Sequence, residues 1–352
     1  AFLWTTARVA SESCLAAPRP TSTMGAGATS LSKEQAEKYK EFDAAKWEAL
    51  TKDDAGKVGV DQLLPFAPAV TCYTADTSIC SMICRVAAEE HGVPNVVHTN
   101  IDIECAMENY EPSFIAIQPK MTVPCMKYGD DVIGDSKDIM YYLSEKHPDA
   151  ALYPAEQKEA IDTFIDMFYS RFGQIARFTF GNWIRKSDKI KEFIGRGKNE
   201  KSAEKLEKAI AEHPEWAEQL AKKLESKKKF DFCAFMLSAN LEEMDASMKE
   251  VLDAMEAALE KTAYVAGDTY TLADCVATAF LARIHIVKDE TMFGPKTAAC
   301  WNEKYKTRPS FQKAYVLWKW EHSLMAKQID VFAEGGDPES VKWTGPPSVI
   351  PG

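Results

Sequence analysis

The chain has 352 residues, of which 46% are hydrophobic and 27% are charged, and its formal net charge is -11. This composition is typical of a globular protein with room for two domains, and no uninterrupted apolar run approaches the roughly 18 residues of a membrane span. The acidic balance argues against a nucleic-acid partner, because proteins that follow a phosphate backbone carry basic surfaces.

Cysteine usage and metal-ligand spacing set two further limits. The nine cysteines are an odd number and lack the spacing of a disulfide framework, which predicts a reducing compartment with mostly buried thiols. The sequence has neither a C-x-x-C nor an H-x-x-x-H pattern, so no metal site is expected.

The first 65 residues read as a leader-like tail followed by a helix. Residues 1–31 are rich in Ser, Thr and Ala and contain a single acidic residue, Glu12, which is typical of an organelle presequence or a flexible tail. With Ala1-Phe2 at its start, the segment resembles the plastid-targeting leaders of algae with red-type secondary plastids. From Ser32 to Leu50 an apolar stripe lies among charges at helical spacing. That stripe packs either on its own domain or, as the alternative, on another subunit.

The next segment combines a strand with the N-terminus of a helix. Ala69 to Tyr73 predicts a buried strand, and a helix is expected to begin at Ser78, two residues before Cys80. The first N–H groups of a helix are unpaired and its dipole is positive there, so a thiolate at this place is stabilised and its pKa is lowered toward neutrality. Ser78 can donate from its hydroxyl, and Cys80 can supply a thiol. The alternatives are that Ser78 is a plain helix cap and Cys80 a small buried hydrophobe.

Further strands and a helix complete an α/β unit of thioredoxin size over residues 66–150. The sequence predicts a strand at 95–100, a hairpin of strands at 123–128 and 131–133, and a helix that begins at Asp135-Ser136 and ends near Lys146. Pro124 stands at the start of a strand that should lie inside the sheet, where the missing N–H is unfavourable. A cis Val123-Pro124 bond would explain this proline and would leave the Val123 backbone exposed to pair with an extended peptide ligand.

Residues 151–335 read as an all-helical domain, followed by a tail at 336–352 that contains Gly and Pro. Thr271 to Asp274 form a predicted capping box. The box opens a helix, Leu272 to Val287, that is apolar on every side and is therefore expected in the core.

Two other features of the helical domain have an ordinary structural interpretation. A charged helical pair is predicted at 201–229 with a break at His213-Pro214, and its basic end, Lys227 to Lys229, is interpreted as a solvated face. A substrate pocket could be lined by Tyr169, Phe172, Arg177 and Trp183. The alternative is that these residues pack inside the domain, because aromatic residues at helical spacing are more often part of the core.

Five blocks of the sequence resemble the glutathione transferase superfamily, in which a thioredoxin-like domain precedes an all-helical domain. Within it, they resemble the tetrachlorohydroquinone reductive dehalogenases and their zeta-class, maleylacetoacetate isomerase-like relatives. The blocks are S-I-C-S-M with R-x-A-x-E-E-x-G at 78–92, A-M-E-N-Y-E-P at 106–112, V-P at 123–124, D-S at 135–136, and G-D-T-Y-T-L-A-D at 267–274 with L-A-R-I at 281–284.

The resemblance implies that glutathione binds and reacts with a small electrophilic substrate, quinone-like or halogenated. Ser78 would hydrogen-bond the glutathione thiolate, and Cys80 would be the second thiol. The Val123-Pro124 segment would pair with the cysteinyl part of glutathione, and Asp135 with Ser136 would hold its γ-glutamyl end. A homodimer is also implied.

The implied reaction has two stages. Glutathione displaces a halide from a quinoid ring, and Cys80 then attacks the sulfur of the adduct, releases the reduced ring and becomes a mixed disulfide that a second glutathione clears. Three positions depart from the related sequences: Ile83 replaces a usual basic residue, Asp135 a commoner Glu or Gln, and Gln118 a frequent Asn. The alternative function is a non-catalytic accessory subunit of a larger, plastid assembly, docked through residues 1–65.

Overall fold

The computed structural model describes residues 30–31, 33, 44–50, 52, 56, 58–59, 70–94, 96–195, 198–229, 236–237, 241–287, 290–315 and 323–341. Residues 1–29 of the leader-like segment and most of the helix predicted at 32–50 lie outside these residues. In the described part of this region, α2 (Ala44–Glu48) is helical, and β1 (Ser30–Leu31) pairs antiparallel with β2 (Val58–Gly59).

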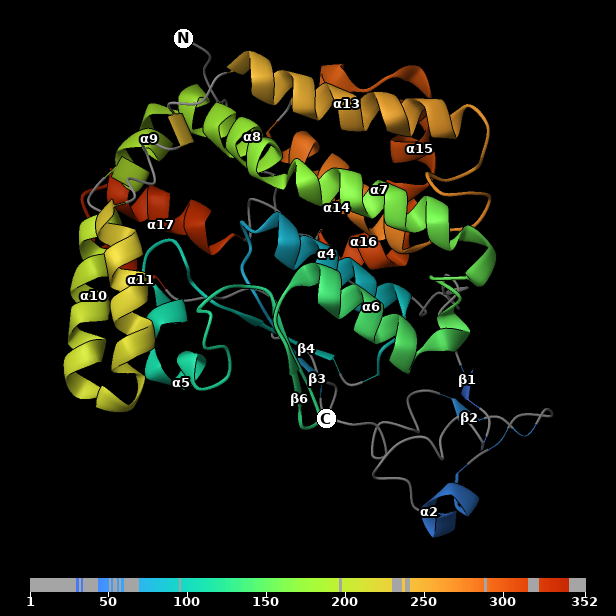
Figure 1. Ribbon diagram of the computed structural model, residues 1–352, viewed down its shortest axis with the longest axis horizontal. Coiled ribbons are helices and arrows are strands. Elements are labelled where there is room, and N and C mark those ends of the chain that lie inside the picture. The colour runs from blue at the N-terminus through green and yellow to red at the C-terminus, as the bar shows by residue number, and fades with distance from the viewer. Residues whose placement is uncertain are drawn as a thin grey trace, which may run out of the picture.

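Four strands form the sheet of the N-terminal domain, in the order β4-β3-β5-β6. They are β3 (Val70–Thr74), β4 (Val96–Asn100), β5 (Cys125–Tyr128) and β6 (Asp131–Ile133). β3 and β4 are parallel, since α4 (Ile79–Glu90) connects them, whereas β5 runs antiparallel to both β3 and β6. α4 and α6 (Ser136–Lys146) pack against each other beside this sheet (Figure 1). The prediction of a thioredoxin-like domain is confirmed.

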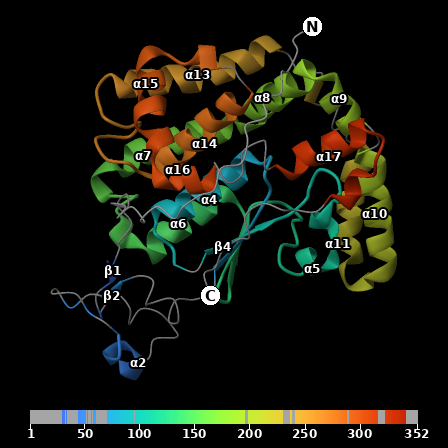
Figure 2. The same ribbon diagram turned by 180° about the vertical axis from the view of Figure 1, so that it is seen from behind.

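The rest of the described chain is helical, as predicted. Its helices are α7 (Lys158–Ser170), α8 (Phe172–Lys186), α9 (Asp188–Gly195), α10 (Lys198–Glu212), α11 (Ala217–Lys229), α13 (Leu241–Leu259), α14 (Leu272–Ile286), α15 (Pro295–Glu303), α16 (Pro309–Ala314) and α17 (Leu324–Ala333). α14 packs against α7 and α4, and Figure 2 shows it among the other helices of this domain. None of the described helices combines the length and the apolar content that a membrane crossing requires.

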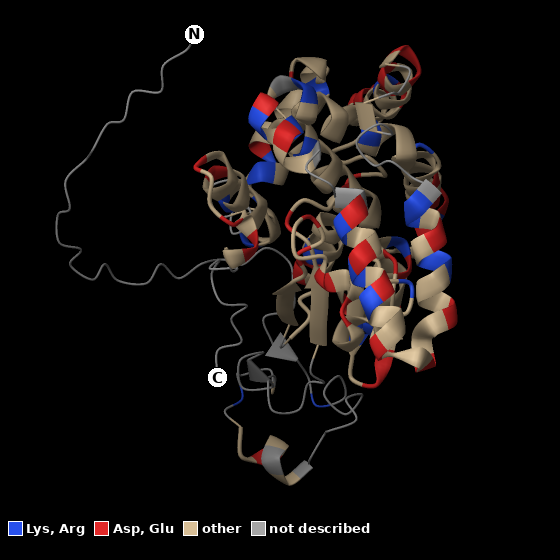
Figure 3. Cartoon of the chain, turned by 90° about the vertical axis from the view of Figure 1, so that its left-hand side faces the viewer, with Lys and Arg blue, Asp and Glu red and all other residues tan. Residues whose placement is uncertain are grey.

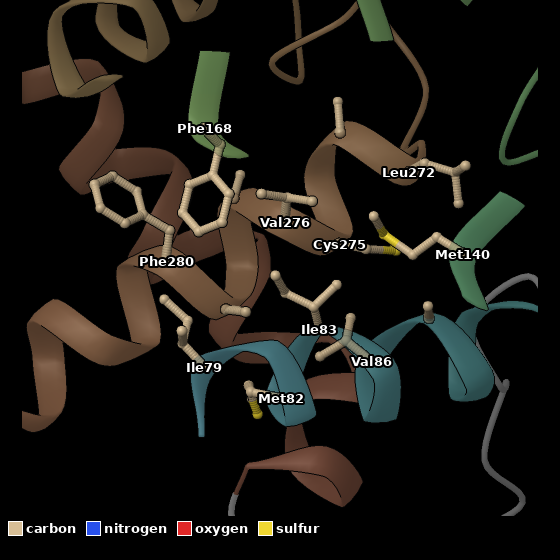
Figure 4. Close-up of a cluster of buried hydrophobic side chains, with 14 of the residues drawn as sticks. Ile79, Met82, Ile83, Val86, Met140, Phe168, Leu272, Cys275, Val276 and Phe280 are labelled. Atoms are coloured by element: carbon tan, nitrogen blue, oxygen red, sulfur yellow. The ribbon is translucent and has the colours of Figure 1, made fainter. Parts of the chain in front are cut away.

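The two domains share one core, in which α4 packs on α14 (Figure 4). Ile79 and Ile83 of α4 are buried there, with Val276 and Phe280 of α14. Burying each such side chain contributes about 1.5–3 kcal/mol, so the placement of the start of α4 relative to the helical domain is strongly fixed. Ile83, the position without the expected basic residue, is part of this apolar contact.

The core helix α14 begins at the predicted capping box. The Asp274 carboxylate accepts hydrogen bonds from the Thr271 N–H at 2.9 Å and the Val265 N–H at 3.1 Å, and from the Tyr305 hydroxyl. All these groups are buried, so the box satisfies polar atoms that would otherwise destabilise the interior.

α10 and α11 form a helical hairpin, with the predicted break between Glu212 and Ala217. The hairpin stands beside α5 (Pro112–Ile115) of the N-terminal domain in both views (Figures 1 and 2). Its inner face joins a buried apolar cluster made of Met107, Tyr110, Ile115, Met121, Leu206, Ala209 and Leu220. The hairpin is therefore packed against the first domain.

Candidate functional site

Ser78 caps the N-terminus of α4, as predicted. Its backbone is extended, with φ -88° and ψ 120°, and its Oγ accepts a hydrogen bond from the Ser81 N–H at 3.2 Å. This leaves the hydroxyl hydrogen of the half-buried Ser78 side chain available to donate.

A cleft of about 380 Å³ opens at this helix end, between the two domains. Its N-terminal-domain wall includes Thr77, Ser78, Cys80, Glu104, Tyr110 and Val123, and its helical-domain wall includes Phe172, Ala176, Phe180, Lys223, Lys227 and Arg283. Three predicted site residues, Ser78, Cys80 and Val123, thus meet on one wall. Asp135 and Ser136 do not line the cleft.

Cys80 lies where the sequence places it, but its thiol does not have the acidity expected of a helix N-terminus. Burial raises the pKa of the Cys80 thiol to about 11, and the nearby Asp135 carboxylate acts in the same direction. A hydrogen bond with Ser136 and the positive charge of Arg283 oppose this rise without cancelling it. The expectation of a lowered pKa is therefore wrong for Cys80, because loss of hydration outweighs the helix dipole here.

The Val123–Pro124 peptide bond is cis, as predicted. Val123 is half-buried and stands just before β5, whose pairing with β3 begins at Cys125. No described residue forms a hydrogen bond with the Val123 backbone. Its N–H and C=O groups can therefore pair with an extended chain bound in the cleft.

Asp135 and Ser136 begin α6, but their side chains are already engaged. Asp135 caps the helix by accepting from the Lys137 N–H at 3.0 Å, and it does so with φ 148°, a backbone region that side chains disfavour. The buried Ser136 hydroxyl is 2.6 Å from the hydroxyl of Tyr169 on α7. Tyr169 therefore touches the predicted site through Ser136, and Phe172 lines the cleft directly.

Comparison with known proteins identifies the fold. The profile of the glutathione S-transferase N-terminal domain matches residues 77–146, and the profile of the C-terminal domain matches residues 238–307. Both domains of the chain thus match the glutathione S-transferase family. Each profile matches a part of the corresponding domain, and the cleft lies between the two domains.

The proteins that this chain resembles include a dehalogenase and a zeta-class enzyme. The chain is 28% identical over 260 residues to the tetrachloro-p-hydroquinone reductive dehalogenase of Sphingobium chlorophenolicum. This alignment covers 73% of this chain and 100% of that protein. It is 35% identical over 100 residues to a zeta-class glutathione S-transferase of Euphorbia esula, over 28% of this chain and 43% of that protein. The fold is similar to that of glutathione transferase F2 from Populus trichocarpa, with a TM-score of 0.51, 18% identity and coverage of 71% of this chain and 98% of that chain.

Sequence reasoning missed the basic residues that line the cleft. Arg283 of α14 is half-buried and donates a hydrogen bond to the Thr77 carbonyl, next to the cap residue Ser78. Burial lowers the pKa of Arg283 to about 10, so its guanidinium stays charged at neutral pH. Arg283 therefore supplies a positive charge at the N-terminus of α4, which Ile83 does not provide. The signal was present in the L-A-R-I block at 281–284, but its spatial neighbour lies some 200 residues earlier in the chain.

The interpretation of Lys227 to Lys229 as a solvated face also needs correction. Lys228 is exposed and forms an ion pair with Glu207, as a solvated lysine would. Lys227 is half-buried and lines the cleft together with Lys223. The hairpin fold turns one side of α11 toward the N-terminal domain, which the composition of the run could not indicate.

Proposed function

We propose that this protein is a glutathione-dependent transferase of the reductive dehalogenase type, which replaces a halogen on a small electrophilic ring by hydrogen. The observation that carries the proposal is the meeting of three groups on one wall of the cleft: the Ser78 hydroxyl, the Cys80 thiol and the Val123 backbone, which pairs with no described residue. The similarity to the Sphingobium dehalogenase, which spans that whole protein, supports the same activity.

Glutathione fits the residues that are present. The Val123 backbone would pair with the cysteinyl unit, and this places the sulfur near the N-terminus of α4, where Ser78 donates to it. The side chains of Asp135 and Ser136 already have hydrogen-bond partners. The γ-glutamyl end would therefore bind to the backbone N–H groups at the start of α6 and to the remaining acceptor positions of the Asp135 carboxylate.

The proposed reaction has two stages, after which a second glutathione regenerates the Cys80 thiol. In the first, the Ser78-stabilised thiolate bonds to the halogen-bearing ring carbon and halide leaves, giving a thioether. In the second, the Cys80 sulfur attacks the thioether sulfur, the carbon–sulfur bond breaks, and the proton of Cys80 ends on the ring carbon. The ring is reduced while the two sulfurs are oxidised to a mixed disulfide. A second glutathione then restores the Cys80 thiol and leaves as glutathione disulfide.

The raised pKa of Cys80 agrees with a late role for its thiol. A thiol that stays protonated at neutral pH resists oxidation and alkylation before substrate binds. The same proton is the one that the ring requires in the second stage. Ser78 and Cys80 thus have separate tasks, the first at the glutathione sulfur and the second at the adduct.

We place the transferase in a reducing compartment, the plastid, from its leader-like N-terminal residues, and expect a homodimer. The proposed activity is tested by incubating the protein with glutathione and tetrachlorohydroquinone as a probe and identifying products by mass spectrometry. Glutathione disulfide and a dechlorinated ring in equal amounts support it. A protein that fails to bind glutathione in calorimetry and that elutes with a larger assembly would contradict it and favour the accessory-subunit function.

A further inference from the structure

The far end of the cleft is lined by two lysines from the helical hairpin. Lys223 and Lys227 are one turn apart on α11, so their side chains leave the same face of the helix. Both are half-buried and both line the cleft, opposite the wall that carries Ser78. The Lys227 ammonium lies 6.0 Å from the ring centroid of Tyr110, a residue of the N-terminal-domain wall.

Lys223 has no counter-charge in the described part of the chain. It forms no hydrogen bond or ion pair with any described residue, although its side chain is half-buried. Burial lowers the pKa of Lys223 from its ordinary value. A partly dehydrated ammonium without an anionic partner is unfavourable unless a ligand supplies one.

The hairpin is held so that these lysines face the cleft. Lys205 of α10 forms an ion pair with Glu111 at 2.6 Å and donates to the carbonyl of Ala106. Leu220 and Leu224, on the same stretch of α11 as Lys223, pack against the apolar cluster beneath. The outer face of the hairpin has charges of both signs (Figure 3). The position of the two inner lysines is therefore set by packing.

The cleft is positively charged although the protein is acidic. Of the described residues that line it, three are basic, Lys223, Lys227 and Arg283, and one is acidic, Glu104. Glu104 already accepts a hydrogen bond from the Thr77 hydroxyl at 3.2 Å. A cationic cleft in a chain of net charge -11 concentrates anions locally.

We infer that Lys223 and Lys227 form a carboxylate-binding end of the cleft, which makes the hairpin a determinant of ligand choice. This inference rests on the proposed function for the identity of its ligands. A carboxylate can come from two sources: an acid group on the second substrate, or the glycyl end of glutathione. In both cases the lysines bind the anion and leave the thiol chemistry to Ser78 and Cys80.

Lysines near a helix C-terminus also interact favourably with the helix dipole. If Lys223 and Lys227 had only this structural role, replacing them would not selectively weaken the binding of anions. This role applies equally to Lys228, which points outward to Glu207. Lys222 likewise pairs outward, with Glu218 at 2.7 Å. The double variant Lys222→Gln/Lys228→Gln is therefore a matched control, since it removes the same charge from the same helix without touching the cleft.

The test uses two dyes that differ by one anionic group, 8-anilinonaphthalene-1-sulfonate and the neutral N-phenyl-1-naphthylamine, with binding followed by fluorescence. In Lys223→Gln/Lys227→Gln, the sulfonate dye should bind about tenfold more weakly or worse, as expected for loss of a charge-assisted contact, while the neutral dye binds as before. The control variant should bind both dyes like the natural chain. Equal loss of the sulfonate dye in both variants, or equal loss of both dyes in the cleft variant, would overturn the inference. The dye-binding experiment tests the inference even if the protein has no activity with glutathione.

Kinetics then separate the two sources of the carboxylate. A raised KM for 4-chloro-3-nitrobenzoate but not for neutral 1-chloro-2,4-dinitrobenzene assigns the lysines to the second substrate. A raised KM for glutathione but not for its glycyl ethyl ester assigns them to glutathione. Unchanged KM values for all four compounds would overturn the role of the lysines in the reaction, whereas absence of turnover in the natural chain would count against the proposed function alone.

Discussion

Arg283 in the core helix of the helical domain donates a hydrogen bond to the backbone carbonyl of Thr77, at the entrance to α4. The contact joins the two domains at the point where the proposed chemistry takes place. The positive charge of Arg283 also lowers the pKa of Cys80, although burial raises that pKa by more. The helical domain thus contributes to the thiol site electrostatically as well as by covering it.

Replacing Arg283 should make Cys80 still less acidic. In Arg283→Met the pKa of Cys80 should rise further above about 11, because the opposing positive charge is lost while burial remains. The rate of Cys80 alkylation by iodoacetamide at pH 8–9, followed by peptide mapping, should fall about tenfold. Arg283→Lys keeps a positive charge and should react at a rate close to that of the natural chain. An unchanged or faster rate in Arg283→Met would show that the guanidinium does not act on this thiol.

Ser78→Ala should slow formation of the thioether. Loss of a hydrogen bond to a thiolate costs about 1.5–3 kcal/mol, which corresponds to a decrease of about ten- to hundredfold in kcat/KM. The substitution also removes the helix cap and should lower the free energy of unfolding by about 1 kcal/mol. Ser78→Thr restores both functions, so activity that is lost in the alanine variant and kept in the threonine variant identifies the hydroxyl as the active group. Equal activity in all three proteins would leave Ser78 as a cap.

Local sequence signals predicted the parts of the site that depend on neighbours in the chain. Ser78 caps its helix and Val123–Pro124 is cis because the residues around them specify these features. Lys223 and Arg283 could not be placed in this way, since tertiary packing brings them to the cleft from far along the chain. The acidity of Cys80 was mispredicted for the same reason: it depends on burial beneath other elements, which a motif at the helix end does not encode.

Asp274→Asn should destabilise the whole protein. The carboxylate accepts hydrogen bonds from the Thr271 and Val265 N–H groups and the Tyr305 hydroxyl, and an amide cannot accept at all of these positions. A buried donor or acceptor left without a partner costs about 1–3 kcal/mol, and the loss should appear as a lower midpoint in urea. A stability equal to that of the natural chain would mean that the capping box does not hold α14 in the core.

The stability of the protein should fall with pH partly through His91. Its Nδ1–H donates to the Ala87 carbonyl at 2.7 Å and its Nε2 accepts from Ser144 at 2.9 Å, and burial lowers its pKa to about 3. Between an unfolded pKa of about 6.5 and this folded value, the unfolded state binds the extra proton. The contribution of neutral His91 is therefore complete above about pH 6.5 and is lost as the pH falls toward 3, by at most about 1.4 kcal/mol per pH unit.

His91→Gln removes this proton linkage. The variant should be less stable than the natural chain at pH 7, and the difference in the free energy of unfolding should narrow as the pH is lowered from 6.5 to 4.5. Urea unfolding of both proteins at several pH values measures this difference in the free energy of unfolding. A difference that stays constant over this range would mean that His91 does not titrate between the folded and unfolded states.

The most direct test of the two-thiol reaction is the product formed by Cys80→Ser with glutathione and tetrachlorohydroquinone. The natural chain should yield dechlorinated ring and, when the second glutathione is limiting, a mixed disulfide at Cys80. The variant should accumulate the glutathione–ring thioether, because Ser78 and Val123 still support the first stage and the Cys80 thiol that cleaves the carbon–sulfur bond has been removed. Dechlorinated ring released by the variant at the rate of the natural chain would contradict the assignment of Cys80 as the second thiol.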